Sequence, residues 1–324
     1  MCIRDRQKGA ANKRKFTRYD VDDDLRIFET LRKAFSKEVI DRLAGGGDKS
    51  DAPIFVLGIL KLLLPVRLLR RFLTRWIMQF GSAWVSCNSF IFSLGNSTRW
   101  DVRGLEGLST RQWYLVFANH QTWVDIVALQ TVFNRRIPFL KFFIKQELIW
   151  FPLLGVAWWA MDMPFMKRYS KSYLAAHPEK KGKDLEATRK ACEKFRDAPT
   201  TVINFVEGTR FTEEKRDHRN SPYQHLLAPR AGGVALALSS MGDMFDAILD
   251  VTIVYPNGAL TFWDMMCGDF DHVAIEIRRR TVEEWLYQGN YTNDREFRKR
   301  FHQWLGDIWE EKDRAIDSVI ATVN

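Results

Sequence analysis

His120 and Asp125, five positions apart, are the residues whose types and spacing best suit proton-transfer chemistry in this chain. An imidazole accepts a proton near neutral pH, and a neighbouring carboxylate can hold the ring in one tautomer. Within a single helix two residues at this spacing would point roughly 140° apart, because each residue turns the helix by about 100°. The pair can therefore meet only where a loop enters a helix.

The residues around His120 predict such a junction. The preceding run, Trp113–Ala118, consists of aromatic and aliphatic residues and is typical of a strand. The segment Thr122–Gln130 can begin a helix, with Asp125 near its first turn. We predict that His120 is a general base at a strand end and that Asp125 orients it.

A second histidine, His302, has an aspartate at the same spacing, Asp307. With six histidines in the chain the bare spacing is a weak signal, and the surroundings must separate the two copies. Apolar residues recur here at intervals of three and four, which predicts one continuous helix in which the two side chains diverge. We interpret His302 as a surface or boundary histidine. The apolar positions are Phe297, Phe301, Trp304, Leu305 and Ile308.

A second group of polar residues also follows a strand-like run. The β-branched stretch Thr200–Val206 ends in Glu207, Gly208, Thr209 and Arg210. Strand ends in open α/β sheets are common ligand sites, and a guanidinium matches a phosphate or carboxylate in shape. Glycine in addition lets a backbone approach a ligand closely. Taken alone, the tetrapeptide fits a turn with a surface ion pair equally well.

In this order, the two motifs resemble those of the lysophospholipid acyltransferase superfamily. Asn119–Asp125 is similar to its histidine–aspartate block, and Phe205–Phe211 to its glutamate–glycine–threonine–arginine block. Between them, Lys145–Leu148 and Pro164–Arg168 resemble basic segments that line the acceptor's phosphate site. Val251–Pro256 resembles a fourth block, a strand that ends in proline. The resemblance extends from residue 100 to the C-terminus.

The amino-acid sequences of two segments, together with the long C-terminal region, resemble one branch of that superfamily. The segments are Met161–Arg168 and Phe205–Thr212. The branch contains the longer probable acyltransferases of proteobacteria, which are related to eukaryotic lysocardiolipin acyltransferases. This resemblance does not fix the acceptor lipid.

The resemblance implies transfer of a fatty acyl group from acyl-CoA or acyl carrier protein to the hydroxyl of an anionic lysophospholipid, with lysophosphatidic acid first. His120 would take the hydroxyl proton while Asp125 stabilises the imidazolium, so transfer is expected to be direct, without an acyl-enzyme. No cofactor or metal is expected. The residues expected to bind the acceptor are Glu207, Gly208, Thr209, Arg210, Lys145, Lys167 and Arg168.

Several alternatives stay open at this point. Another anionic lysophospholipid could replace lysophosphatidic acid, and a thioesterase or lysophospholipase would use water in the same pocket. A non-catalytic lipid-binding protein would bind lipid without turnover. The solvated loop pair Lys167-Arg168 and the strand end Tyr255-Pro256 also have purely structural explanations.

Composition indicates a cationic protein at an anionic surface. The chain has 324 residues, a net charge of +9, a pI of about 9.4 and 12 tryptophans. Such charge suits nucleic acid or a membrane. No nucleic-acid motif is recognisable, so we expect a membrane surface and no nucleic acid as partner. The four cysteines lack metal-site spacing, and phosphate-loop, serine-hydrolase and zinc-protease motifs are not recognisable.

Strand-like runs alternate with helical patterns from residue 99 onward, which predicts an α/β fold with a largely parallel central sheet flanked by helices. Helices are expected at Asp184–Arg196, Ala231–Leu238 and Phe297–Val323. The strands are expected at Trp100–Arg103, Trp113–Ala118, Ile137–Phe143, Val202–Val206, Val251–Tyr255 and Val273–Arg278.

We expect three regions: a polar extension with a helix near Leu25–Leu43 (1–51), membrane-associating helices (52–98) and an acyltransferase domain (99–324). The apolar run Ala52–Pro65 is shorter than the roughly 20 residues that cross a bilayer. Basic and apolar residues alternate at helical spacing from Arg67 to Ile77, which indicates a helix that lies on anionic lipid. Alternatively, that helix covers the catalytic domain with its arginines in solvent. The expected location is the cytoplasmic face of the bacterial inner membrane.

Overall fold

The computed structural model describes residues 67–95, 97–151, 154–166, 192–258, 261–267 and 271–323. The helices expected at Leu25–Leu43 and Ala52–Pro65 lie outside these ranges, as does most of the helix expected at Asp184–Arg196. At the end of that last segment, Glu193–Asp197 form a short 3-10 helix.

The described residues fold around a six-stranded sheet whose strands lie in the order β1-β8-β7-β2-β6-β3. Adjacent strands are parallel except for the antiparallel pair β7 and β8, so the expected α/β fold with a largely parallel sheet is confirmed. The strands are β1 (Arg99–Arg103), β2 (Tyr114–Ala118), β3 (Leu140–Phe142), β6 (Thr201–Phe205), β7 (Ala247–Val254) and β8 (His272–Arg280).

Two strands begin three or more residues away from the expected position. β3 was expected from Ile137, but the N–H of Ile137 bonds to the carbonyl of Phe133 in a helical turn, and Pro138 has no N–H for a sheet ladder. β7 begins at Ala247, before the expected Val251, because its first half pairs with both β2 and β8. Every residue of β7 is buried, as befits a strand with neighbours on both sides.

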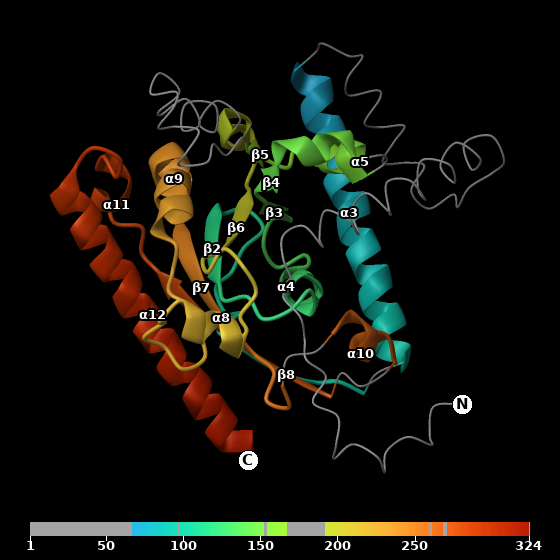
Figure 1. Ribbon diagram of the computed structural model, residues 1–324. Helices are drawn as coiled ribbons and strands as arrows, with labels where there is room; N and C mark the ends of the chain where they lie inside the picture. Colours follow the sequence, from blue (N-terminus) through green and yellow to red (C-terminus); the bar gives the residue numbers. More distant parts are fainter. Residues whose placement is uncertain are drawn as a thin grey trace.

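Helices cover both faces of the sheet (Figure 1). α9, α11 and α12 lie on one face, and α3, α4 and α10 on the other (Figure 1). Alternation along β2 supplies both cores: Leu115 and Phe117 join the α9 and α12 side, whereas Val116 and Ala118 join the α4 side. The helices are α3 (Arg67–Gly95), α4 (Val124–Phe133), α5 (Leu154–Ala160), α8 (Glu213–His218), α9 (Ala231–Met241), α10 (Phe262–Cys267), α11 (Trp285–Gln288) and α12 (Arg295–Val323).

One face of the long helix α3 packs on the rest of the protein, and the opposite face is exposed to solvent. Leu73, Ile77 and Val85 are buried, whereas Trp76 and Trp84 are about half exposed. Part of the apolar face expected to meet lipid therefore packs on the domain. Within the described ranges, no helix combines the length and apolar character that crossing a bilayer requires.

Candidate active site

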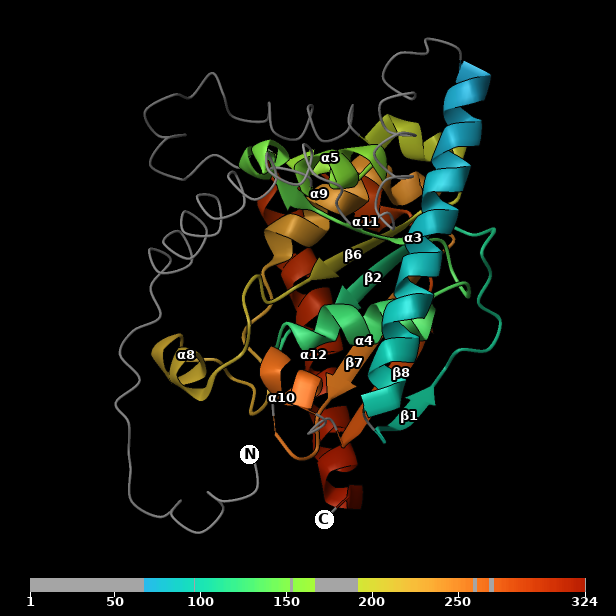
Figure 2. The same cartoon turned by 90° about the vertical axis from the view of Figure 1, so that its right-hand side faces the viewer.

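The two polar motifs meet at one edge of the sheet. β2 and β6 are parallel neighbours, with Ala118 opposite Phe205 in the register. Their carboxyl ends point toward the same side of the molecule, the side on which α8 lies (Figure 2). The loops that carry His120 and Glu207 start directly after these ends, so the topology brings together residues far apart in the sequence.

His120 and Asp125 are in direct contact. Nδ1 of His120 lies 2.8 Å from Oδ2 of Asp125, which is fully buried in the first turn of α4. The same oxygen accepts the N–H groups of Gln121 at 2.6 Å and Thr122 at 3.0 Å. The expected contact across a loop-to-helix junction is thus confirmed, because the intervening turn wraps around the carboxylate.

The second oxygen of Asp125 is bonded to Tyr255, a residue whose role the sequence left open. Tyr255, buried after β7, donates its hydroxyl to Oδ1 at 2.8 Å. Burial, and then the charge of Asp125, raise the pKa of Tyr255 well above its ordinary value, so it stays a donor. The signal in the sequence was its position at the end of a strand, and only the pairing of β7 with β2 makes that position adjacent to Asp125.

The imidazole of His120 is fixed on a second side by an aromatic ring. Phe205 stacks on it with centroids 4.1 Å apart and planes 18° apart. The His120 side chain is 15% exposed. Because Nδ1 faces the carboxylate, it carries the proton in the neutral ring and Nε2 has the basic lone pair. This arrangement can accept a proton from a substrate hydroxyl.

Glu207 is part of the scaffold around His120. It is fully buried, and its Oε1 accepts the backbone N–H of His120 at 2.9 Å while its Oε2 accepts that of Leu227 at 2.8 Å. Burial raises the pKa of Glu207 from 4.5 to about 7, although the two backbone bonds and the charge of Lys312 pull it down. The geometry therefore favours positioning of the backbone over the substrate contact expected from the sequence.

The rest of this motif forms a tight turn that presents a cation. Gly208 has φ +69, the left-handed region that favours glycine, and an added Cβ would lie 2.8 Å from the Arg230 side chain. The Arg210 guanidinium lies over the Trp123 ring, 5.3 Å from its centroid. Trp123 is 59% exposed, so this cation–π pair lies near the surface beside the His120 loop.

Thr209 contacts a basic residue that sequence reasoning missed. Lys215 of α8 donates to the Thr209 hydroxyl at 3.3 Å and to the Arg210 carbonyl at 3.0 Å. Its ammonium therefore braces the turn that carries Arg210. The sequence of α8 contains both acidic and basic residues and does not predict this contact. The contact depends on the position of α8 relative to the turn that carries Thr209 and Arg210.

The remaining basic residues are placed only through their backbone. Lys145 lies in β4 (Ile144–Lys145), which pairs with β5 (Phe165–Met166) in parallel, with Lys145 opposite Met166. Lys167 and Arg168 follow β5 in the sequence and lie outside the described residues. The pairing thus places Lys145 next to the described part of the second segment, Pro164–Met166.

His302, the second histidine with an aspartate at this spacing, lies elsewhere. It is exposed on α12 and its Nε2 is 2.9 Å from the Tyr291 hydroxyl. The interpretation as a surface histidine is confirmed. Among the residues that the structure describes, no three His, Cys, Asp or Glu side chains are grouped as a metal site would need.

Comparison with known proteins agrees with the motifs. Residues 99–256 match the family model described as Acyltransferase. A 1-acyl-sn-glycerol-3-phosphate acyltransferase 3 of Arabidopsis thaliana is 27% identical over 218 residues, 63% of this chain and 52% of that protein. The delta enzyme of Mus musculus is 25% identical over 212 residues, 61% of this chain and 51% of that protein. The chain thus spans about half the length of these relatives.

A solved structure, the 1-acyl-sn-glycerophosphate acyltransferase PlsC of Thermotoga maritima, aligns with a TM-score of 0.45 and 16% identity over 91% of this chain and 97% of that one. By these sequence matches, residues 99–256 are similar to an acyltransferase domain, and the chain is similar to 1-acyl-sn-glycerol-3-phosphate acyltransferases.

Proposed function

We propose that this protein transfers a fatty acyl group from an acyl thioester, acyl-CoA or acyl carrier protein, to the free hydroxyl of lysophosphatidic acid. The observation that carries the proposal is the 2.8 Å contact between His120 Nδ1 and Asp125 Oδ2 at the carboxyl end of β2. The similar proteins are acyltransferases for 1-acyl-sn-glycerol-3-phosphate, and the choice of acceptor follows theirs.

In the reaction, Nε2 of His120 takes the proton of the acceptor hydroxyl as its oxygen attacks the thioester carbonyl. The tetrahedral intermediate then collapses, the carbon–sulfur bond breaks, and the imidazolium returns the proton to the thiolate. Asp125 stabilises the imidazolium and keeps the useful tautomer. The acceptor's oxygen is itself the nucleophile, so no acyl-enzyme forms.

Arg210 is proposed to bind the acceptor phosphate. Its guanidinium is presented at the edge of the site, supported by Trp123, and can form two parallel bonds to phosphate oxygens. Lys145, Lys167 and Arg168 are proposed to add positive charge, since Lys145 lies opposite Met166, the residue that precedes Lys167 in the sequence. Gly208 and Thr209 would shape the turn, and Glu207 would hold the backbone at His120.

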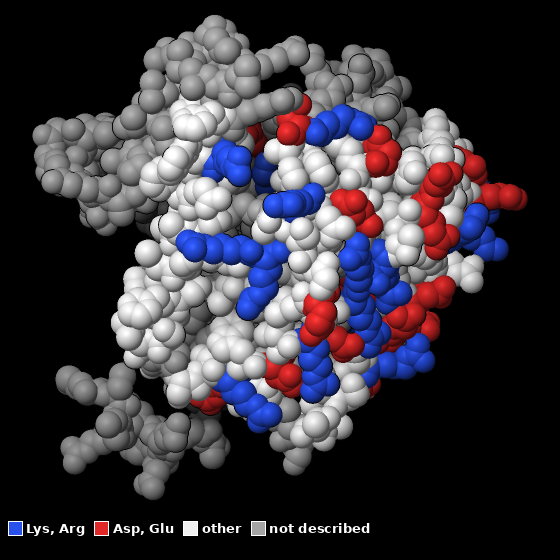
Figure 3. Space-filling model, turned by 180° about the vertical axis from the view of Figure 1, so that it is seen from behind, with Lys and Arg blue, Asp and Glu red and all other residues white. Residues whose placement is uncertain are grey.

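Membrane association at the cytoplasmic face is proposed for α3. Large apolar side chains lie exposed along this helix, which suits an interfacial position. On the face turned away from the viewer of Figure 1, the basic and acidic side chains are interspersed on the described residues (Figure 3). That face therefore lacks the one-sided charge that would favour it for anionic lipid. The exposed side chains are Phe72, Trp76, Phe80, Trp84, Phe90, Ile91 and Leu94.

The test is transfer from labelled oleoyl-CoA to lysophosphatidic acid by purified protein. We expect labelled phosphatidic acid from wild type and from His302→Ala, and a loss of at least about a thousandfold in His120→Ala. Free oleate without phospholipid product would instead indicate a hydrolase that uses water. Lipid binding without turnover in wild type would indicate a binding protein, and equal turnover in all three proteins would remove His120 from the reaction.

A further inference from the structure

The C-terminal helix α12 lies outside the 99–256 match, yet it is tied to the residues that hold His120. Trp309, Lys312 and Asp313 are spaced by three and four positions and so share one face of the helix. Trp309 and Lys312 are buried. A buried lysine and two further polar groups on one face need specific partners, and these partners lie near the site.

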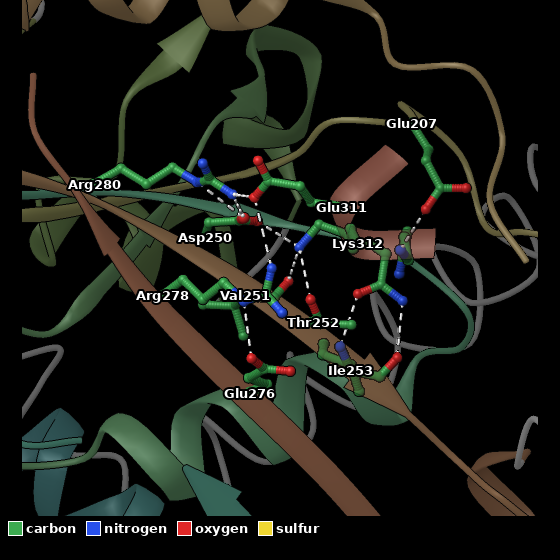
Figure 4. A network of polar contacts seen from close by, with 12 residues as sticks. Glu207, Asp250, Val251, Thr252, Ile253, Glu276, Arg278, Arg280, Glu311 and Lys312 are labelled. Atoms are coloured by element: carbon green, nitrogen blue, oxygen red, sulfur yellow. Dashed lines mark hydrogen bonds and ion pairs between the residues drawn. The ribbon is translucent and has the colours of Figure 1, made fainter. Parts of the chain in front are cut away.

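Lys312 attaches α12 to the central sheet. Its ammonium contacts Asp250 Oδ1 at 2.6 Å, the Val251 carbonyl at 2.6 Å and the Thr252 hydroxyl at 3.2 Å (Figure 4). Arg280 of β8 binds the other oxygen of Asp250 at 2.9 Å. The helix therefore has a fixed position relative to β7, whose carboxyl end borders the site.

Two neighbouring residues of α12 hold the loop that precedes α9. Asp313 accepts the backbone N–H groups of Gln224 at 2.9 Å and His225 at 2.8 Å. The Trp309 indole N–H donates to the Leu227 carbonyl at 3.1 Å. The segment 224–227 is thus fastened to the helix at three backbone atoms.

Leu227 connects this segment to the site. Its carbonyl is bound by Trp309, while its N–H donates to Glu207 Oε2. Glu207 Oε1 in turn accepts the N–H of His120. Unbroken hydrogen bonds therefore run from a helix face outside the matched domain to the backbone of His120.

We propose that α12 positions His120, acting through Leu227 and Glu207. Trp309 and Asp313 are positioning residues, because neither is placed to touch a substrate and both act through the segment 224–227. With this segment loosened, Glu207 loses one of its two donors and the His120 backbone loses its defined position. The consequence for turnover rests on the proposed function, whereas the consequence for the His120 loop does not.

The test compares Trp309→Phe, which removes the indole N–H, with Trp304→Phe on the same helix. It also compares Asp313→Ala with Asp307→Ala. The first measurement is deuterium uptake in peptides covering 119–125 and 221–230. We expect faster exchange in both peptides for Trp309→Phe and Asp313→Ala, with melting temperatures close to those of the controls.

The second measurement is steady-state transfer to lysophosphatidic acid. We expect kcat to fall about tenfold in Trp309→Phe and Asp313→Ala with KM nearly unchanged, since positioning affects the transition state more than substrate binding. Asp313→Asn, which keeps one acceptor oxygen, should recover part of the loss. Unchanged exchange at 119–125, or equal effects in the controls, would overturn the proposal. If wild type transfers no acyl group, the proposed function fails and the exchange data still decide this inference.

Discussion

Tyr255 donates its hydroxyl to Asp125 Oδ1 at 2.8 Å, on the opposite oxygen from the one that faces His120. The two residues are 130 positions apart and meet because β7 and β2 are adjacent. Asp125 therefore has hydrogen-bond donors on both oxygens. A carboxylate held in this way cannot rotate away from the imidazole, so Tyr255 contributes to the geometry of the proposed catalytic pair.

Tyr255→Phe should lower kcat about tenfold and leave both KM values nearly unchanged, because it frees the carboxylate without removing it. The free energy of unfolding should fall by about 1 kcal/mol, the worth of one hydrogen bond. Steady-state kinetics and urea unfolding check both values. Tyr114→Phe is the matched control, since the Tyr114 hydroxyl at the start of β2 is bonded to Gln112 and not to Asp125. Equal kcat in the two variants would leave Tyr255 with a purely structural role.

Asp125→Asn should reduce kcat by about three to four orders of magnitude, because the neutral amide cannot stabilise an imidazolium. The amide is close in shape to the carboxylate, so circular dichroism and the melting temperature should stay close to wild type. Asp307→Asn, the aspartate paired in sequence with His302, should keep full turnover. Turnover within tenfold of wild type in Asp125→Asn would contradict its assigned role.

Glu207→Gln tests the burial of a carboxyl whose pKa is raised to about 7. For an acid with a raised folded-state pKa, the contribution of that group to the free energy of unfolding is fully present below pH 4.5 and is lost as pH rises through 7. Over that window wild type should lose about 3 kcal/mol of unfolding free energy relative to Glu207→Gln. Urea unfolding of both proteins from pH 4 to 9 measures the difference, and a constant difference would show that Glu207 does not titrate in this range.

Arg210→Lys should raise KM for lysophosphatidic acid about tenfold while KM for oleoyl-CoA changes little, because an ammonium cannot form two parallel bonds to phosphate. Arg219→Lys, a change at the exposed end of α8, is the control. The assay varies each substrate in turn. If KM for the thioester rises instead, Arg210 binds the donor and not the acceptor.

Trp76→Glu and Trp84→Glu should weaken sedimentation with phosphatidylglycerol–phosphatidylcholine vesicles several-fold, because a charge on this stripe of α3 opposes interfacial burial. Gln303→Glu adds the same charge at an exposed position of α12, on the other face of the sheet, and should bind like wild type. Equal vesicle binding by all four proteins would assign the membrane contact to another surface.

The sequence by itself determined the elements and the two motifs at strand ends. Alternation and helical periodicity are local properties, so β2, β6, α9 and α12 were predicted close to their observed bounds. The contact of His120 with Asp125 was also local, since five residues of loop and helix start suffice to form it. The pair His302 and Asp307 has the same spacing, and the helical periodicity around it showed that those two side chains diverge.

Only the tertiary structure decided the roles of Glu207, Tyr255 and α12. Glu207 bonds to backbone groups 87 and 20 positions away, and Trp309 of α12 reaches back 82 positions to Leu227. Such contacts depend on which strands are neighbours and on where a helix lies on the sheet. Side-chain spacing within a segment contains no information on either, because packing between segments sets both.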